Sequence, residues 1–122
     1  MSYPGVDIVE IERFSEACRR QPRLTDRLFT LAERESLAGK GMQSWAARFA
    51  AKEAVLKALG TGLAGLSWHD IEILNQPSGE PIVVLSPRAR QIANTRGKGE
   101  VRLSLTHNKT QAIAVAILVS AD

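Results

Sequence analysis

One stretch near the middle of the chain decides how it folds: Trp45–Gly62, with the sequence WAARFAAKEAVLKALGTG. Residues 45–59 are mostly good helix formers, and Gly60 follows them as a natural helix C-cap. At about 100° per residue, the large apolar side chains form one stripe, and alanines occupy nearly everything opposite. Because surface helices usually carry Lys, Glu and Gln there, we predict a central helix that is buried on most sides.

A carboxylate lies at the edge of this stripe. Burying Glu53 is costly unless it is paired, hydrogen-bonded or bound to a metal. One interpretation is an ion pair with Lys57, one turn further along, which stabilises a surface helix by only about 0.2–0.5 kcal/mol. The other interpretation includes Asp7, which stands between Val6 and Ile8 in a predicted strand, where aspartate is disfavoured. Two carboxylates from separate elements, with cations nearby, suit magnesium and phosphate.

Hydrophobic patterning along the rest of the chain predicts an α+β fold. Before the central helix we expect a short strand around residues 6–8 and a helix over about 12–20. A second helix begins with a capping box formed by Thr30 and Glu33 and ends at Gly39. After the central helix we expect strands at 71–74, 81–85, 101–106 and 112–119, with a helix over 88–95 between the second and third of these. The predicted class is a single domain over residues 1–122, with a mainly antiparallel sheet packed with helices.

The last predicted strand bears on assembly. Residues 112–119 read AIAVAILV, which is apolar on both faces. Such a strand must be covered on both sides, by a helix on one and by more protein on the other. In a chain of 122 residues, another subunit is a reasonable source of that cover.

Composition narrows the class of protein. The lone Cys18 excludes an internal disulfide and a multi-cysteine metal site, and favours a reducing compartment. We find no signal-peptide pattern at the N-terminus, and the longest apolar run is far too short to cross a bilayer. We therefore expect a soluble, cytoplasmic protein.

The net charge of +3 is modest, but its distribution is uneven. Four arginines gather with a single acid, Asp26, in one segment: Arg19, Arg20, Arg23 and Arg27. Such a patch attracts an acidic protein, a phosphorylated ligand or a nucleic acid, or is simply a solvated face. No aromatic side chain is interleaved with these arginines, which argues against a base-stacking platform.

Four motifs stand out in order along the chain: GVDIVEIER at 5–13, FT with Glu33 at 29–33, RFAAKEAVLKALGTG at 48–62, and SLTH at 104–107. Together they resemble the holo-[acyl-carrier-protein] synthases, whose patterns include GxDIxExxR and RFAAKEAxxKAxGTG. The resemblance covers essentially the whole chain. One departure is Tyr3, which stands where the family often has a glycine two residues before the one matching Gly5.

The resemblance implies one phosphopantetheinyl transferase domain over residues 1–122, with the fold of that family. Such enzymes transfer the 4′-phosphopantetheine group from coenzyme A to a serine of apo-acyl carrier protein and release adenosine 3′,5′-bisphosphate. They are typically homotrimers with active sites between subunits. Partners would be coenzyme A and a carrier protein of fatty-acid or polyketide synthesis, with no nucleic acid and no membrane. The alternative is a non-catalytic basic module that binds an acidic protein or RNA.

The resemblance also implies roles for individual residues. Asp7 and Glu53 would hold Mg²⁺, and either Glu53 or a water on the metal would take the serine proton. Lys57 would assist the leaving phosphate. Candidates for coenzyme A binding are Arg48, Lys52 and His107, together with Gly60 and Gly62, whose alternative role is a C-cap and connector. Candidates for docking the carrier protein are Arg13, Arg19, Arg20 and Arg23.

Overall fold

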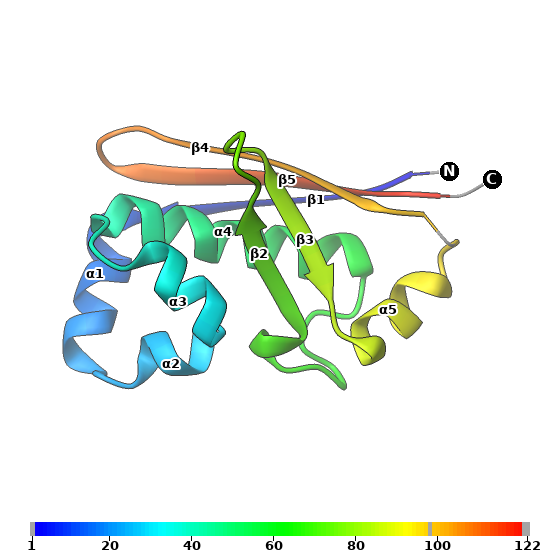
Figure 1. Ribbon diagram of the computed structural model, residues 1–122, viewed down its shortest axis with the longest axis horizontal. Helices are drawn as coiled ribbons and strands as arrows, with labels where there is room; N and C mark the ends of the chain where they lie inside the picture. The colour runs from blue at the N-terminus through cyan, green and yellow to red at the C-terminus, as the bar shows by residue number, and fades with distance from the viewer. Residues whose placement is uncertain (1, 98, 121–122) are drawn as a thin grey trace.

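The computed structural model describes residues 2–97 and 99–120 (Figure 1). The elements in chain order are β1 (Ser2–Glu10), α1 (Ile11–Arg20), α2 (Leu24–Leu28), α3 (Leu31–Leu37), α4 (Met42–Leu59), the 3-10 turn η1 (Trp68–Asp70), β2 (Ile71–Asn75), β3 (Pro81–Leu85), α5 (Pro87–Asn94), β4 (Val101–His107) and β5 (Gln111–Val119). Strands β1, β5 and β4 form an antiparallel sheet in that order, and β2 pairs with β3 in an antiparallel hairpin. The α+β class with antiparallel pairing is as predicted.

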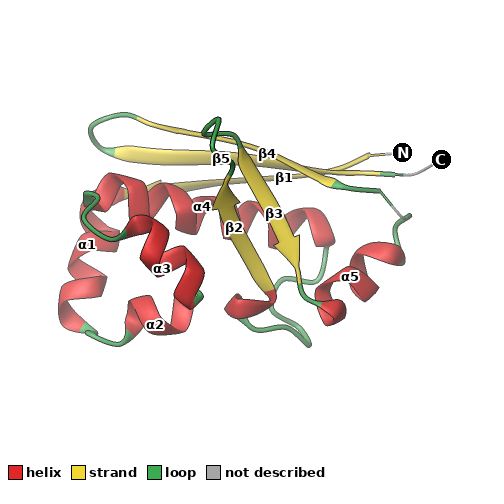
Figure 2. Ribbon diagram, in the orientation of Figure 1, coloured by secondary structure: helices red, strands yellow, loops and turns green. Residues whose placement is uncertain are grey.

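Helix α4 lies at the centre of the molecule. It runs along one face of the three-stranded sheet, and α1 and β2 also contact it (Figures 1 and 2). Eleven of its 18 residues are buried, mostly alanines, because small side chains let neighbouring elements approach closely. This confirms the prediction of a helix covered on most sides. Among the described residues, no helix has the length and apolar character that a membrane crossing requires.

Strand β1 lies very close to α4 at Gly5. A Cβ atom added to Gly5 would lie 2.0 Å from the Ala54 carbonyl oxygen and 2.7 Å from the Ala58 amide nitrogen. Only glycine fits there without moving the strand or the helix. Because side chains alternate along a strand, Asp7, two residues later, also faces the helix, while Val6 and Ile8 face outward.

The outward face of the three-stranded sheet is apolar and exposed. Along β5 the alanines and Leu118 are buried against the helix side. The side chains that point the other way form a surface we call the outer sheet face: Val6, Ile8, Ile113, Val115 and Ile117, each between 37% and 57% exposed. This confirms a last strand that is apolar on both sides.

Several elements differ from the sequence-based expectation. Helix α4 begins at Met42, three residues before the predicted start, and β1 extends over Ser2–Glu10 where only a short strand around residues 6–8 was predicted. Neither α2 nor the turn η1 was predicted. A helix of five residues is too short to show a period and owes its stability to packing. Its packing residue is Leu28, which is buried in one cluster with Phe14 and Phe29.

Candidate active site

Three predicted site residues meet where β1 crosses α4. Asp7 projects from β1, while Glu53 and Lys57 lie one turn apart on the helix. The Lys57 Nζ lies 3.0 Å from Asp7 Oδ1 and donates a second hydrogen bond, also of 3.0 Å, to the Val6 carbonyl. Lys57 therefore pairs with the strand, which corrects the alternative of a simple ion pair with Glu53 within the helix.

The electrostatics of this group favour a cation. Burial raises the pKa of Glu53 above its ordinary value, the negative charge of Asp7 raises it further, and Lys57 partly opposes the effect. Two carboxylates thus repel each other with one lysine close by. Within the described residues, no cluster of three or more His, Cys, Asp or Glu side chains is placed to hold an ion. The pair fits Mg²⁺, which usually takes one or two carboxylates and completes its shell with water and substrate oxygens.

The two carboxylates open into a cleft with a volume of ≈ 570 Å³. Its walls come from β1, α1, α2, α4 and the start of β5. Arg13 and Arg20 of α1 also line the cleft, and Phe14, Leu24 and Phe49 provide an apolar surface. The cleft therefore combines an acidic end, basic side chains and an apolar wall, as a ligand with a charged head and a neutral arm requires.

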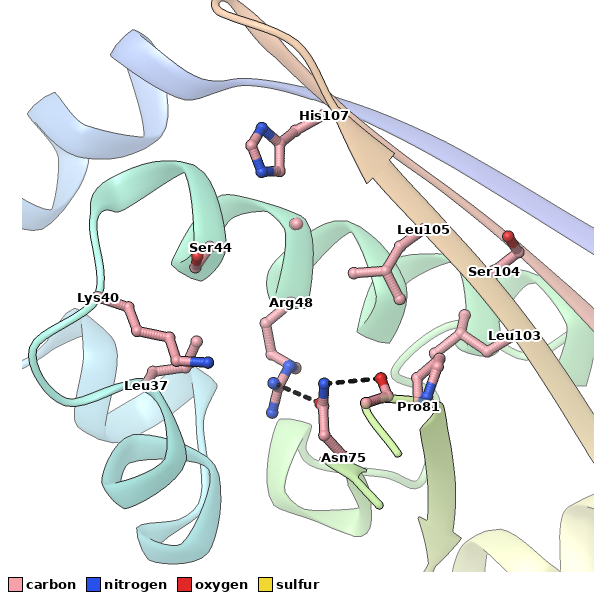
Figure 3. A pocket seen from close by; sticks show the side chains of 12 residues that line it. Leu37, Lys40, Ser44, Arg48, Asn75, Pro81, Leu103, Ser104, Leu105 and His107 are labelled. Atoms are coloured by element: carbon pink, nitrogen blue, oxygen red, sulfur yellow. Dashed lines mark hydrogen bonds between the residues drawn. The ribbon is translucent and has the colours of Figure 1, made fainter. Parts of the chain in front are cut away.

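A second pocket, of ≈ 280 Å³, lies between α4, the β2–β3 turn and β4 (Figure 3). Arg48 lies on its α4 side and is nearly buried, and its guanidinium donates to the Ile73 carbonyl and, at 2.9 Å, to Asn75 Oδ1. His107 at the end of β4 and Lys40 also line the pocket. Three basic side chains around one hollow suit an anionic ligand. Lys40 was missed because a loop lysine between two glycines has no distinguishing sequence pattern.

Lys52 lines neither pocket. Its side chain is fully buried, and its Nζ lies 2.6 Å from Oε1 of the equally buried Glu33. Burial lowers the pKa of Lys52, while the adjacent Glu33 carboxylate opposes that shift. The expectation that Lys52 binds a coenzyme A phosphate is corrected, since its ammonium group is already bound inside the protein.

The glycines after α4 act through the backbone. Gly60 has φ +84°, and its amide donates to the Leu56 and Lys57 carbonyls, which ends the helix. The Arg96 guanidinium fills the space that a side chain on Gly60 would need. Neither Gly60 nor Gly62 lines the two pockets. The structure therefore supports the alternative of a C-cap and connector over contact with a ligand.

The predicted docking arginines lie together on α1 and at the start of α2. All four are exposed. Arg13 pairs with Glu10 at 3.6 Å and Arg19 with Glu16 at 3.9 Å, both between exposed side chains. Such pairs hold their partners weakly, so these arginines stay accessible to an acidic surface.

The site residues fall into two groups on different faces of α4. Arg48 and Glu53 are five residues apart, so their side chains leave the helix in directions about 140° apart. The two pockets share no lining residue. The chain therefore presents a carboxylate cleft and a basic pocket as separate surfaces.

The sequence profile of the 4′-phosphopantetheinyl transferase superfamily matches residues 3–116. The chain belongs to this superfamily. A holo-[acyl-carrier-protein] synthase of Moorella thermoacetica is 49% identical over 118 residues, which are 95% of this chain and 92% of the relative. A relative with the same description from Desulforudis audaxviator is 50% identical over 118 residues, which are 94% of this chain and 90% of the relative.

Solved structures agree with these relatives. A Helicobacter pylori holo-[acyl-carrier-protein] synthase in complex with coenzyme A is 31% identical, with a TM-score of 0.82 over 93% of this chain and 96% of that one. A Bacillus anthracis holo-(acyl-carrier-protein) synthase in complex with CoA (3′,5′-ADP) is 35% identical. Its TM-score is 0.80, over 98% of this chain and 96% of that one. The predictions of family and of fold class are confirmed.

Proposed function

We propose that this chain transfers the 4′-phosphopantetheine group of coenzyme A to a serine hydroxyl of an apo-acyl carrier protein and releases adenosine 3′,5′-bisphosphate, with Mg²⁺ as its metal. The observation that carries the proposal is the meeting of Asp7, Glu53 and Lys57 at an open cleft. The chain's relatives described as holo-[acyl-carrier-protein] synthases support the same reaction. They also disfavour the alternative of a non-catalytic basic module.

Phosphoryl transfer requires charge neutralisation and in-line positioning more than covalent help from the enzyme. Asp7 and Glu53 would hold Mg²⁺, which supplies Lewis-acid stabilisation of charge on the diphosphate. Lys57, oriented by Asp7, places a mobile positive charge beside the oxygens of the leaving phosphate. Either Glu53 or a water on the metal would take the serine proton.

Coenzyme A carries a second anionic region, the 3′-phosphate of its nucleotide. The basic pocket lined by Arg48, Lys40 and His107 suits this end of the substrate. It opens on a different face of α4 from the carboxylate cleft, so a neighbouring subunit is a natural source of one half of each site. We propose a homotrimer in which the outer sheet face is covered by other copies of the chain, with the active sites between subunits.

The carrier protein is proposed to dock on Arg13, Arg19, Arg20 and Arg23. Two of them, Arg13 and Arg20, line the cleft in which the transferred group would be held. A positive rim of this kind accelerates association with an acidic partner more than it tightens the final complex. We place the reaction in the cytoplasm, where the free, half-buried thiol of Cys18 stays reduced.

The direct test is a transfer assay. The purified protein is incubated with coenzyme A, Mg²⁺ and an apo-acyl carrier protein, and the intact mass of the carrier is recorded. We expect the mass of one phosphopantetheine arm to be added, and no addition when the metal is removed with EDTA. A folded protein that leaves the carrier mass unchanged in the complete mixture would refute the proposal.

A further inference from the structure

A buried ring of polar contacts joins α3, α4 and β2 beside the basic pocket. Glu33 Oε1 accepts hydrogen bonds from Lys52 Nζ at 2.6 Å and from the Thr30 amide at 2.8 Å. Glu33 Oε2 accepts one from the Ile73 amide at 2.8 Å. Arg48, one helical turn before Lys52, donates to the carbonyl of the same Ile73 and closes the ring.

A gain in stability is a weak explanation for the buried ion pair between Lys52 and Glu33. Both side chains are fully buried, and a buried ion pair is often no more stabilising than apolar residues of the same volume. The effect of these charges is instead on the position of strand β2. Strand β2 pairs only with β3 among the described strands, so its other edge presents free backbone groups. Glu33 and Arg48 bind the amide and the carbonyl of Ile73 on that edge and so hold β2 against α4.

The position of β2 determines the shape of the basic pocket. The strand ends at Asn75, whose side chain accepts from Arg48 at 2.9 Å and donates to the Gly79 carbonyl at 3.2 Å (Figure 3). Asn75 and Gly79 both line the pocket. Both acceptors of Arg48, the Ile73 carbonyl and Asn75 Oδ1, therefore belong to the strand that Glu33 holds.

We propose that Glu33 and Lys52 are positioning residues for coenzyme A. They touch no substrate. By holding Ile73, they fix Arg48 and the β2–β3 turn in the arrangement with which the pocket binds the anionic nucleotide end. This inference rests on the proposed function. It explains why a lysine next to Glu53 is buried instead of facing the ligand, since its contact with Glu33 orients the arginine one turn away.

The test uses the charge-neutral double variant Glu33→Gln/Lys52→Met, which removes both charges and nearly preserves volume. We expect the Kd for adenosine 3′,5′-bisphosphate, measured by calorimetry without carrier protein, to rise roughly tenfold, below the ~100-fold that a 1 Å misplacement of a positioning group costs. The KM for coenzyme A rises in parallel. The KM for the carrier protein and kcat stay within about twofold, because the carboxylate cleft is on another face of α4.

Two controls separate positioning from general loosening. Val55→Ala removes buried volume from the same helix outside the ring, so it lowers the melting temperature and leaves the Kd for the nucleotide unchanged. In an Arg48→Ala background, the double variant adds no further loss, because its effect passes through that arginine. If the double variant does not fold, Lys52→Gln alone, which keeps a neutral hydrogen-bond donor for Glu33 beside its two amide donors, gives a smaller rise in the same Kd.

The inference is overturned by an unchanged nucleotide Kd in the folded variants, or by an equal loss in the Arg48→Ala background. It is also overturned if the KM values of both substrates rise together. Failure of the proposed function has a different signature, since the unmodified protein would then neither bind adenosine 3′,5′-bisphosphate nor modify the carrier.

Discussion

Lys57 Nζ lies 3.0 Å from Asp7 Oδ1 and ties the helix that carries Glu53 to the strand that carries the second carboxylate. The Lys57 side chain is 54% exposed and that of Asp7 only 16%. An ion pair with one exposed partner adds little stability. The pair matters for chemistry, because it holds one cation beside two carboxylates that line a cleft.

The replacement Glu53→Ala tests the carboxylate. We expect kcat/KM for transfer to fall by at least about 10³-fold, because charge stabilisation at the transferring phosphorus and proton removal are lost together. The mass-shift assay measures this. Glu35→Ala, at an exposed position on α3, is the matched control and keeps full activity. A Glu53→Ala protein that melts like the parent and still modifies the carrier at the parent rate would remove Glu53 from the mechanism.

The same carboxylate reduces stability when no metal is bound. Because burial and Asp7 raise the pKa of Glu53 above 4.5, the folded chain binds this proton more tightly than the unfolded chain. The free energy of unfolding therefore falls as pH rises from 4.5 through the raised pKa, and the loss is complete above it. We expect Glu53→Gln to stabilise the protein in EDTA at neutral pH by less than ~1 kcal/mol, since solvent screens this half-buried group.

Thermal melts in EDTA across the acid and neutral range measure that difference. The gain from Glu53→Gln is largely lost below 4.5, where the parent carboxyl is protonated in both states. A gain of the same size at acid and neutral pH would show that repulsion between Asp7 and Glu53 is not its source.

Much of the fold follows from local sequence patterns. The capping box of Thr30 and Glu33 and the Gly60 C-cap appear where the sequence predicted them. These features succeed because each depends on a few neighbouring residues. The uninterrupted apolar run of the last strand likewise predicted its two apolar faces.

Local sequence patterns could not predict contacts between segments that are distant in the chain. Lys52 lies in a motif that suggested a phosphate ligand, but its partner Glu33 is 19 residues away on another helix. Glu33 was predicted as half of a capping box and as part of one motif, and the structure gives its carboxylate two further partners, Lys52 and Ile73. A periodicity shows which face a residue occupies, whereas the partner on that face depends on how the elements pack.

Charge reversal tests the docking surface. In the triple variant Arg19→Glu/Arg20→Glu/Arg23→Glu, we expect the KM for the carrier protein to rise about tenfold at ~0.02 M salt and much less at ~0.5 M, because salt screens exposed charges. Initial rates at both salt concentrations measure it. Arg88→Glu on α5, at the other end of the molecule (Figure 1), is the control and leaves the KM unchanged. An unaltered KM in the triple variant would exclude these arginines from docking.

A substitution on the outer sheet face tests the proposed assembly of the chain into a homotrimer. Val115 and Val84 are comparably exposed strand valines, at 41% and 44%, but only Val115 lies on the outer sheet face. We expect Val115→Asp to yield a monomer with at least about tenfold slower transfer, because assembly would bury an unpaired charge. Val84→Asp should keep the oligomer and the activity. Light scattering coupled to size exclusion reports the mass, and a trimeric Val115→Asp protein would place the interface elsewhere.

The close approach of β1 to α4 gives the last prediction. In Gly5→Ala the new methyl group would overlap the Ala54 carbonyl, so the strand must move away from the helix. We expect the free energy of unfolding to fall by ~1–3 kcal/mol, as for other overpacked contacts. Transfer should fall with it, because Asp7 moves away from Glu53. Chemical denaturation and the mass-shift assay measure the two effects.

Gly41→Ala is the matched control for this substitution. A Cβ atom there meets only the flexible end of Gln43, and the backbone φ of −73° is open to any residue. Its stability and activity should therefore stay close to those of the parent. If Gly5→Ala were as stable and active as Gly41→Ala, the closeness of strand and helix at Gly5 would not be what brings the two carboxylates together.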